Sequence, residues 1–299
     1  MASRVFSTST GRNQQSFTAT DWGLFWSIGL VWGSSFLFIA IGLEAFRPGL
    51  ITWLRVALGA ATLWAFPRAR RRVEREDWPR LLALSLFWVA IPFTLFPIAQ
   101  QWINSALTGM LNGAMPIFAA AIGSIMLRRL PRGPQLLGLV VGFAGVAAIA
   151  SPSMGKGDSE ALGAVLVIAA TVCYGVAVNI AAPIQQRYGS LPVMARMLGL
   201  ATIWTAPLGL VDALDSGWGW DSFLAVTAAG MLGTGIAFVI MGTLVGSVGS
   251  TRASFITYVI PVVALGLGVV FLDDRVTIVS IAGVVLVIAG ALLASRRER

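Results

Sequence analysis

The chain lacks most of the side chains that enzymes and metal sites use. It contains no histidine and one cysteine, Cys173, among its 299 residues. Without histidine there is no imidazole acid–base catalysis, proton relay or metal site, and one cysteine makes no intramolecular disulfide. All thirteen Asp and Glu residues lie outside the long apolar segments or at their ends. We therefore expect no catalytic group, no metal and no other cofactor.

Two arginines are the only charged residues inside apolar segments. Arg55 lies about seven residues into its segment, a depth of roughly 10 Å in a helix, and Arg196 lies nearer the start of another segment. A guanidinium in a medium of low dielectric pairs well with a carboxylate, which makes Arg55 a candidate for binding a substrate. The alternative, stronger for Arg196, is that the side chain reaches back to the membrane surface.

Asn112 is the sharpest polar candidate, because it lies in the middle of an apolar segment one helical turn before Pro116. A buried amide needs hydrogen-bond partners, and a proline leaves a nearby carbonyl unpaired, so the two together suit an amino or carboxyl group. Thr257 and Pro261 repeat this arrangement 145 residues later. Pro116 and Pro261 are therefore predicted hinges. Hydrogen bonding between helices is the alternative for Asn112, and the same two interpretations apply to Asn179.

Aromatic side chains form the second candidate set. Four are predicted to line a cavity for apolar or aromatic groups: Trp32, Trp102, Tyr174 and Tyr258. Trp32 and Tyr174 each precede a glycine. Packing against lipid or protein is the alternative for each of the four. Tryptophans at segment edges are better explained as a membrane-interface belt.

The elements that position these residues are predicted to be membrane helices. Hydrophobic residues make up 57% of the chain and charged residues 11%, against about 25% charged in soluble domains. A membrane helix needs about 20 mostly apolar residues. The charges delimit ten such segments: Trp22–Leu43, Pro48–Pro67, two within Leu81–Leu127, Gly133–Gly155, Ala161–Gln186, Leu191–Val211, Ser222–Thr251, Ala253–Leu272 and Val276–Ser295. We expect an all-α integral membrane protein with ten transmembrane helices, preceded by a flexible cytoplasmic tail, residues 1–21.

The basic residues indicate orientation. Of the 21 Lys and Arg residues, sixteen fall in the tail and the alternate loops that share its side, and three fall in the other loops. Cytoplasmic loops are enriched in Lys and Arg, so both termini are predicted to be cytoplasmic in a multi-pass protein of the bacterial inner membrane. This distribution also argues against a nucleic-acid partner, which the net charge of +8 alone would allow.

The chain repeats itself at an offset of 145 residues. The matching pairs are Ser105 with Ser250, Pro116 with Pro261, Gly138 with Gly283, and Gly145 with Gly290. Each half, 22–151 and 161–295, would then hold five helices. Because five is odd, the second half starts from the opposite side of the membrane and has the inverted topology. Such inverted repeats build many secondary transporters. The repeated glycines are expected to let helices pack closely.

These motifs resemble the EamA-type branch of the drug/metabolite transporter superfamily, and within it the YddG-like amino-acid exporters. The residues that carry the resemblance are Val31-Trp32-Gly33-Ser34-Ser35-Phe36, Pro48 to Arg55, Ala114-Met115-Pro116 and Gly138 to Gly145, with Tyr174-Gly175, Val259-Ile260-Pro261 and Gly283 to Gly290 in the second half.

The resemblance implies a secondary transporter that exports small metabolites by alternating access, amino acids with aromatic or apolar side chains above all. It implies a small-molecule substrate and the lipid bilayer as partners, and we expect a monomer. The alternatives are a transporter of another metabolite or drug class and a channel-like facilitator. An intramembrane enzyme is disfavoured, because the segments hold no nucleophile–base pair. Without a buried acid we expect transport without proton coupling, although acids at segment ends leave coupling open.

Overall fold

The computed structural model describes residues 18–126, 128, 133–154, 157–248 and 253–294, and every regular element among them is a helix. The first half contains α1 (Ala19–Gly33), α2 (Ser35–Leu43), α3 (Pro48–Trp64), η2 (Pro67–Arg70), η3 (Arg75–Asp77), α4 (Trp78–Leu84), η4 (Ser85–Ala90), α5 (Ile91–Ala99), α6 (Ser105–Asn112), α7 (Met115–Met126) and α8 (Gly133–Met154). The second half contains α9 (Asp158–Tyr188), α10 (Ser190–Leu214), α11 (Trp220–Gly230), η5 (Met231–Ile236), α12 (Ala237–Val248), η6 (Ser254–Tyr258), α14 (Ile260–Leu272) and α15 (Ile278–Ala294). Of the predicted tail, residues 1–21, positions 1–17 lie outside the described residues.

Eight helical segments of the described chain are long and apolar enough to cross a membrane. Several of them join consecutive helices, as α1 and α2 do over Ala19–Leu43. The all-α membrane class is therefore confirmed. Helices α3 and α15 stand where the second and tenth segments are predicted, but with 17 residues each they are shorter than those eight. Helix length alone thus leaves the predicted count of ten open.

Local sequence explains where several helices begin. Thr18 and Asp21 form a reciprocal capping box at the start of α1, which satisfies backbone donors that the first turn leaves unpaired. Pro48 occupies the first position of α3, where a proline loses no hydrogen bond. Asn104 caps α6, since its Oδ1 accepts from the Leu107 backbone N–H at 2.9 Å.

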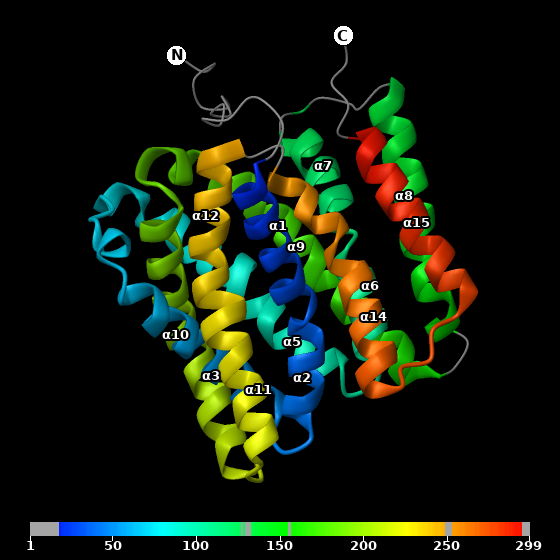
Figure 1. Ribbon diagram of the computed structural model, residues 1–299, viewed down its shortest axis with the longest axis horizontal. Helices are drawn as coiled ribbons and strands as arrows, with labels where there is room; N and C mark the ends of the chain where they lie inside the picture. The colour runs from blue at the N-terminus through cyan, green and yellow to red at the C-terminus, as the bar shows by residue number, and fades with distance from the viewer. Residues whose placement is uncertain (1–17, 127, 129–132, 155–156, 249–252, 295–299) are drawn as a thin grey trace.

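The helices form one bundle in which helices from the two halves pack in pairs (Figure 1). Helix α3 packs along α10, α6 along α14, and α8 along α15. Each pair joins the segments predicted to correspond in the two halves. Helix α1 begins and α15 ends at the end of the bundle that is uppermost in Figure 1, here called the upper end. The end where α2 passes into α3 is called the lower end.

Glycines bring α8 and α15 together, as the sequence predicts. A Cβ added to Gly145 would lie 2.7 Å from the Gly283 carbonyl oxygen, and one added to Gly290 would lie 2.6 Å from the Gly138 carbonyl oxygen. Ordinary van der Waals contacts of carbon are about 3.5 Å or longer. No side chain larger than hydrogen fits at these positions without separating the two backbones.

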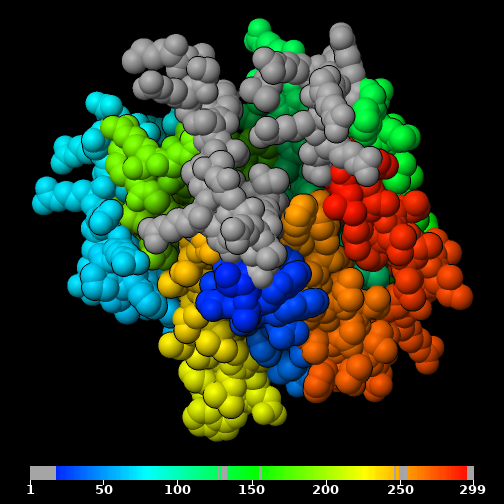
Figure 2. Space-filling model, turned by 45° about the horizontal axis from the view of Figure 1, so that its top comes forward, coloured from blue at the N-terminus to red at the C-terminus, as the bar shows by residue number. Residues whose placement is uncertain are grey.

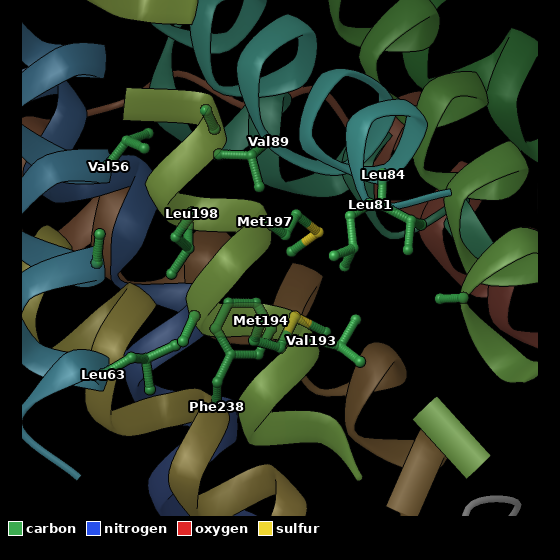
Figure 3. Close-up of a cluster of buried hydrophobic side chains, with 14 of the residues drawn as sticks. Val56, Leu63, Leu81, Leu84, Val89, Val193, Met194, Met197, Leu198 and Phe238 are labelled. Atoms are coloured by element: carbon green, nitrogen blue, oxygen red, sulfur yellow. The ribbon is translucent and has the colours of Figure 1, made fainter. Parts of the chain in front are cut away.

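The largest buried cluster lies on the other side of the bundle, around α10. Figure 3 shows Met194, Met197 and Leu198 of α10 among side chains that include Leu63 of α3 and Leu81 of α4. This packing fixes α3 and the segment from α4 to α5 relative to each other. Figure 2, which turns the upper end forward, shows α1 between α12 and the segment of η6 and α14, and α1 contacts all three elements.

Two short π-helical turns interrupt the predicted third and eighth segments. They are η4 and η5, which begin at Ser85 and Met231 and so stand 146 residues apart. A π-turn locally rotates the residues that follow it, and such turns are frequent at functional sites. The sequence analysis predicts neither of them.

Candidate functional site

A cavity of about 130 Å³ lies in the middle of the bundle. Helices of both halves contribute to it, and fifteen residues line it: Trp32, Ser35, Phe36, Arg55, Trp88, Phe93, Phe96, Asn112, Met115, Tyr174, Val178, Gly233, Phe238, Thr257 and Ile260. Five of the predicted substrate-binding residues are among them, namely Trp32, Arg55, Asn112, Tyr174 and Thr257.

The cavity lies where two membrane segments are broken. Helix α6 ends at Asn112 and α7 starts at Met115, with Pro116 as its second residue. In the other half the 3₁₀ turn η6 holds Thr257, and α14 follows with Pro261 as its second residue. The two breaks touch, because a Cβ on Gly113 would lie 2.8 Å from Cγ of Pro261. The predicted hinge prolines therefore stand at equivalent breaks on either side of one contact.

Arg55 points into the protein and does not reach the membrane surface. The residue is 7% exposed, so the interpretation that it reaches back to the surface is wrong. Its Nε donates to Thr234 Oγ1 at 3.2 Å, its Nη2 donates to Ser35 Oγ at 3.3 Å, and its guanidinium lies 4.3 Å from the centre of the Phe93 ring. Thr234 belongs to the π-turn η5, so that turn fixes the arginine in place.

Asn112 is partly exposed, but its Oδ1 atom is buried and has no hydrogen-bond partner in the described part of the chain. Side chains that hold helices together behave differently. Asn179, for example, donates to the Ala119 carbonyl at 2.9 Å and to the Gly175 carbonyl at 2.8 Å. The structure thus favours interhelical bonding for Asn179 and leaves the Asn112 oxygen available to a ligand.

Aromatic rings form much of the cavity wall. The Trp32 indole is fixed, because its Nε1 donates to the Gly233 carbonyl at 3.0 Å and its ring meets Phe238 edge to face at 5.9 Å. On the lower side, Phe96 meets Phe36 at 5.6 Å and Tyr174 at 5.8 Å between ring centroids. The wall suits an apolar or aromatic group of a ligand.

Below the aromatic wall, α6 and α14 close the bundle. A Cβ on Gly109 of α6 would meet Ala264 of α14 and, at 3.1 Å, the Phe36 ring. Asp274, just beyond α14, accepts hydrogen bonds from Ser105 Oγ at 2.8 Å and from the Ala106 N–H at 2.9 Å. This carboxylate caps the start of α6 and ties the two halves together at the lower end.

The other sequence candidates lie away from the cavity. Trp102 is in the turn after α5, is 38% exposed, and borders a separate cavity at the lower end. Tyr258 follows Thr257 in a 3₁₀ turn, where neighbouring residues point about 120° apart, and it packs instead against the hydrophobic cluster of Ile117, Leu139, Ala291 and Ala294. Arg196 donates to the Ala69 and Pro192 carbonyls at 3.1 and 3.0 Å near the upper end.

Sequence reasoning missed ten of the fifteen residues that line the cavity. Trp88, Phe93 and Phe96 come from the η4–α5 segment, and Phe238 comes from α12. Aromatic residues are common throughout the membrane segments, so their type alone does not tell a lining residue from a lipid-facing one. Thr234, which binds Arg55, carries no sequence signal, and Ser35, which also binds it, belongs to the first-segment motif but is not among the predicted site residues.

Comparisons with known proteins agree with this architecture. The model of the EamA-like transporter family matches the chain twice, at residues 21–151 and 161–296. A relative named "Probable terminal-alkyne amino-acid exporter" from Streptantibioticus cattleyicolor is 28% identical over 92% of this chain and 93% of its own. The "Probable amino-acid metabolite efflux pump" of Escherichia coli is 24% identical over 87% of this chain and 90% of its own.

Two further similarities are less specific. "Uncharacterized transporter YoaV" of Bacillus subtilis is 24% identical and covers 89% of this chain and 94% of its own. One solved crystal structure has a TM-score of 0.60 over 93% of this chain and 97% of its own, at 19% sequence identity. At that identity the structural likeness shows a shared fold and nothing more.

Proposed function

Because the chain belongs to the EamA-like transporter family, and is therefore a membrane transporter, we propose that it exports small metabolites, chiefly amino acids, by alternating access through the central cavity. The observation that carries this proposal is the position of the cavity. It lies at the contact between two equivalent helix breaks, Asn112–Met115 and η6, and both halves of the chain line it. A site between two exchangeable halves can face first one side of the membrane and then the other.

The proposed topology is ten membrane-crossing helices in two inverted five-helix repeats, residues 22–151 and 161–295. It is supported by the two family matches and by the packing of α3 with α10, α6 with α14 and α8 with α15. The equivalent π-turns η4 and η5 add to this support. At 1.5 Å per residue, α3 and α15 are each about 25 Å long, which a bilayer with a core of about 30 Å tolerates by local thinning.

We propose that both termini are cytoplasmic and that the membrane is the bacterial inner membrane. The excess of Lys and Arg in the tail and the loops on its side supports this orientation. The upper end would then face the cytoplasm, and the contacts between α6 and α14 would close the site from the outside.

Amino acids are the proposed substrates for two reasons. Two relatives carry names that refer to export of amino acids or their metabolites. The cavity, about 130 Å³, is below the roughly 300–1,000 Å³ of pockets that hold drug-sized ligands. The contacts between α6, α14 and Asp274 at the lower end argue against an open channel. The cavity residues Trp32, Arg55, Asn112, Tyr174 and Thr257 are proposed to contact the substrate, and Pro116 and Pro261 to act as hinges.

Purified protein in liposomes tests this proposal. Uptake of labelled amino acids should saturate. Unlabelled amino acid on the opposite side should accelerate this uptake, because the carrier then returns with a substrate bound. Flux that rises linearly with concentration and shows no counterflow would indicate a channel. A panel of amino acids that gives no flux at all would exclude the amino-acid substrate.

A further inference from the structure

Arg55 brings into the cavity a positive charge that no ion pair among the described residues neutralises. Its contacts, Ser35, Thr234 and the Phe93 ring, are all neutral. In the described part of the chain the ion pairs involve other arginines, and none includes Arg55. Two of its five N–H donors make the hydrogen bonds to Thr234 and Ser35, which leaves donors for a further acceptor. A buried charge without a counter-ion is costly, so an anionic group of a ligand would complete this site.

Asn112, in the same cavity, favours a ligand group of the opposite charge. Its buried Oδ1 lacks a donor in the described residues. Asn112 is also the last residue of α6, which spans Ser105–Asn112, and the end of a helix carries partial negative charge on its unpaired carbonyls. An acceptor at a helix C-terminus favours a cationic donor such as an ammonium group.

We propose that Arg55 and Asn112 form a two-point clamp for a zwitterionic headgroup, in which the guanidinium binds the carboxylate and the Asn112 end of α6 binds the ammonium. The proposal rests on the assignment of this cavity as the transport site. A free α-amino acid carries both of the charged groups that these two residues would bind. A plain amine leaves the Arg55 charge uncompensated, and a plain carboxylic acid leaves the Asn112 oxygen unpaired.

In this arrangement the aromatic wall contacts the side chain of the substrate. The cavity that holds the two polar groups is also lined by Trp32 and Phe238 on one side and by Phe96 and Tyr174 on the other. Of its fifteen lining residues Arg55 alone is charged, so the cavity offers no cation or carboxylate to pair with a charged side chain in addition to the headgroup. The predicted substrate class is therefore the zwitterionic amino acid with an apolar or aromatic side chain.

Binding to the purified full chain tests the clamp with three matched ligands: L-phenylalanine, phenethylamine, which lacks the carboxylate, and 3-phenylpropanoate, which lacks the ammonium. A hydrogen bond to a charged group changes affinity by about 10–100-fold. Wild-type protein should bind L-phenylalanine at least 10-fold more tightly than either analogue. The Asn112→Leu variant should lose its preference over 3-phenylpropanoate but keep its preference over phenethylamine. Arg55→Gln should show the reverse pattern.

Three further variants keep the result interpretable. Arg55→Lys retains the charge and should keep part of the preference for a carboxylate, even if Arg55→Gln folds poorly. Arg196→Gln removes the other arginine within a segment, outside the cavity, and should leave all three affinities unchanged. Asn179→Leu removes a bonded asparagine and should lower stability without changing the order of the ligands.

The outcomes separate the clamp from the transport proposal. Counterflow of L-phenylalanine together with equal binding of all three ligands would overturn the clamp and leave the transporter assignment standing. An unchanged order of ligands in both Asn112→Leu and Arg55→Gln would do the same. Absence of binding and of counterflow for the whole amino-acid panel would overturn the clamp together with the amino-acid substrate.

Discussion

The glycine contact between α8 and α15 gives a prediction whose magnitude follows from the backbone geometry. Gly145→Ala would place a Cβ 2.7 Å from the Gly283 carbonyl oxygen and 2.7 Å from the Val287 nitrogen. Both are backbone atoms, so no side-chain rotation relieves the overlap. The helices must separate by several tenths of an ångström along an interface that runs the length of α15. Overpacking of this kind costs about 1–3 kcal/mol.

Gly266 of α14 is the matched control. A Cβ added there meets nothing within 4 Å. Alanine is favoured over glycine in a helix interior by about 1 kcal/mol, and this gain is common to both substitutions. The difference between Gly145→Ala and Gly266→Ala therefore isolates the contact, and we expect Gly145→Ala to be the less stable variant by about 1–3 kcal/mol.

Reversible unfolding by SDS in mixed micelles measures this difference directly. Ligand affinity of the folded Gly145→Ala protein should stay at the wild-type value, because neither α8 nor α15 lines the central cavity. Equal unfolding free energies for the two variants would refute the close packing of α8 on α15. Loss of affinity without loss of stability would show that this pair takes part in the transport site.

Three other outcomes are expected. In a Cys173→Ala background, a cysteine at Ser216 should react with a membrane-impermeant thiol reagent from outside and one at Gly133 only after permeabilisation; the opposite pattern would invert the topology. Amino-acid flux in liposomes should persist when the pH gradient and the membrane potential are collapsed, whereas accumulation that a protonophore abolishes would establish proton coupling. Asp274→Ala should lower the free energy of SDS unfolding by about 1–2 kcal/mol, because it removes the acceptor for Ser105 and for the N-terminus of α6. An unchanged free energy of unfolding would mean that this cap does not stabilise the lower end.

The amino-acid sequence by itself determines the class of the protein and the course of its helices. Apolar segments bounded by charges, proline at the start of α3 and the Thr18–Asp21 capping box are local signals, and each acts within one or two helical turns. The constant offset between Pro116 and Pro261 is also visible without a structure. These features indicate the helices, the family and the two breaks, because they depend on neighbours in the chain and on the bilayer.

Only the tertiary structure decides which side chains share the cavity. Whether Arg55 reaches the membrane surface or the interior depends on the packing of α3 against η5, which brings Thr234 within 3.2 Å of its Nε. Whether Thr257 or Tyr258 lines the site depends on a 3₁₀ turn that points adjacent residues in different directions. Helix rotation and π-turns are set by contacts between segments far apart in the sequence, so hydropathy and residue type, which are read along the chain, do not encode them.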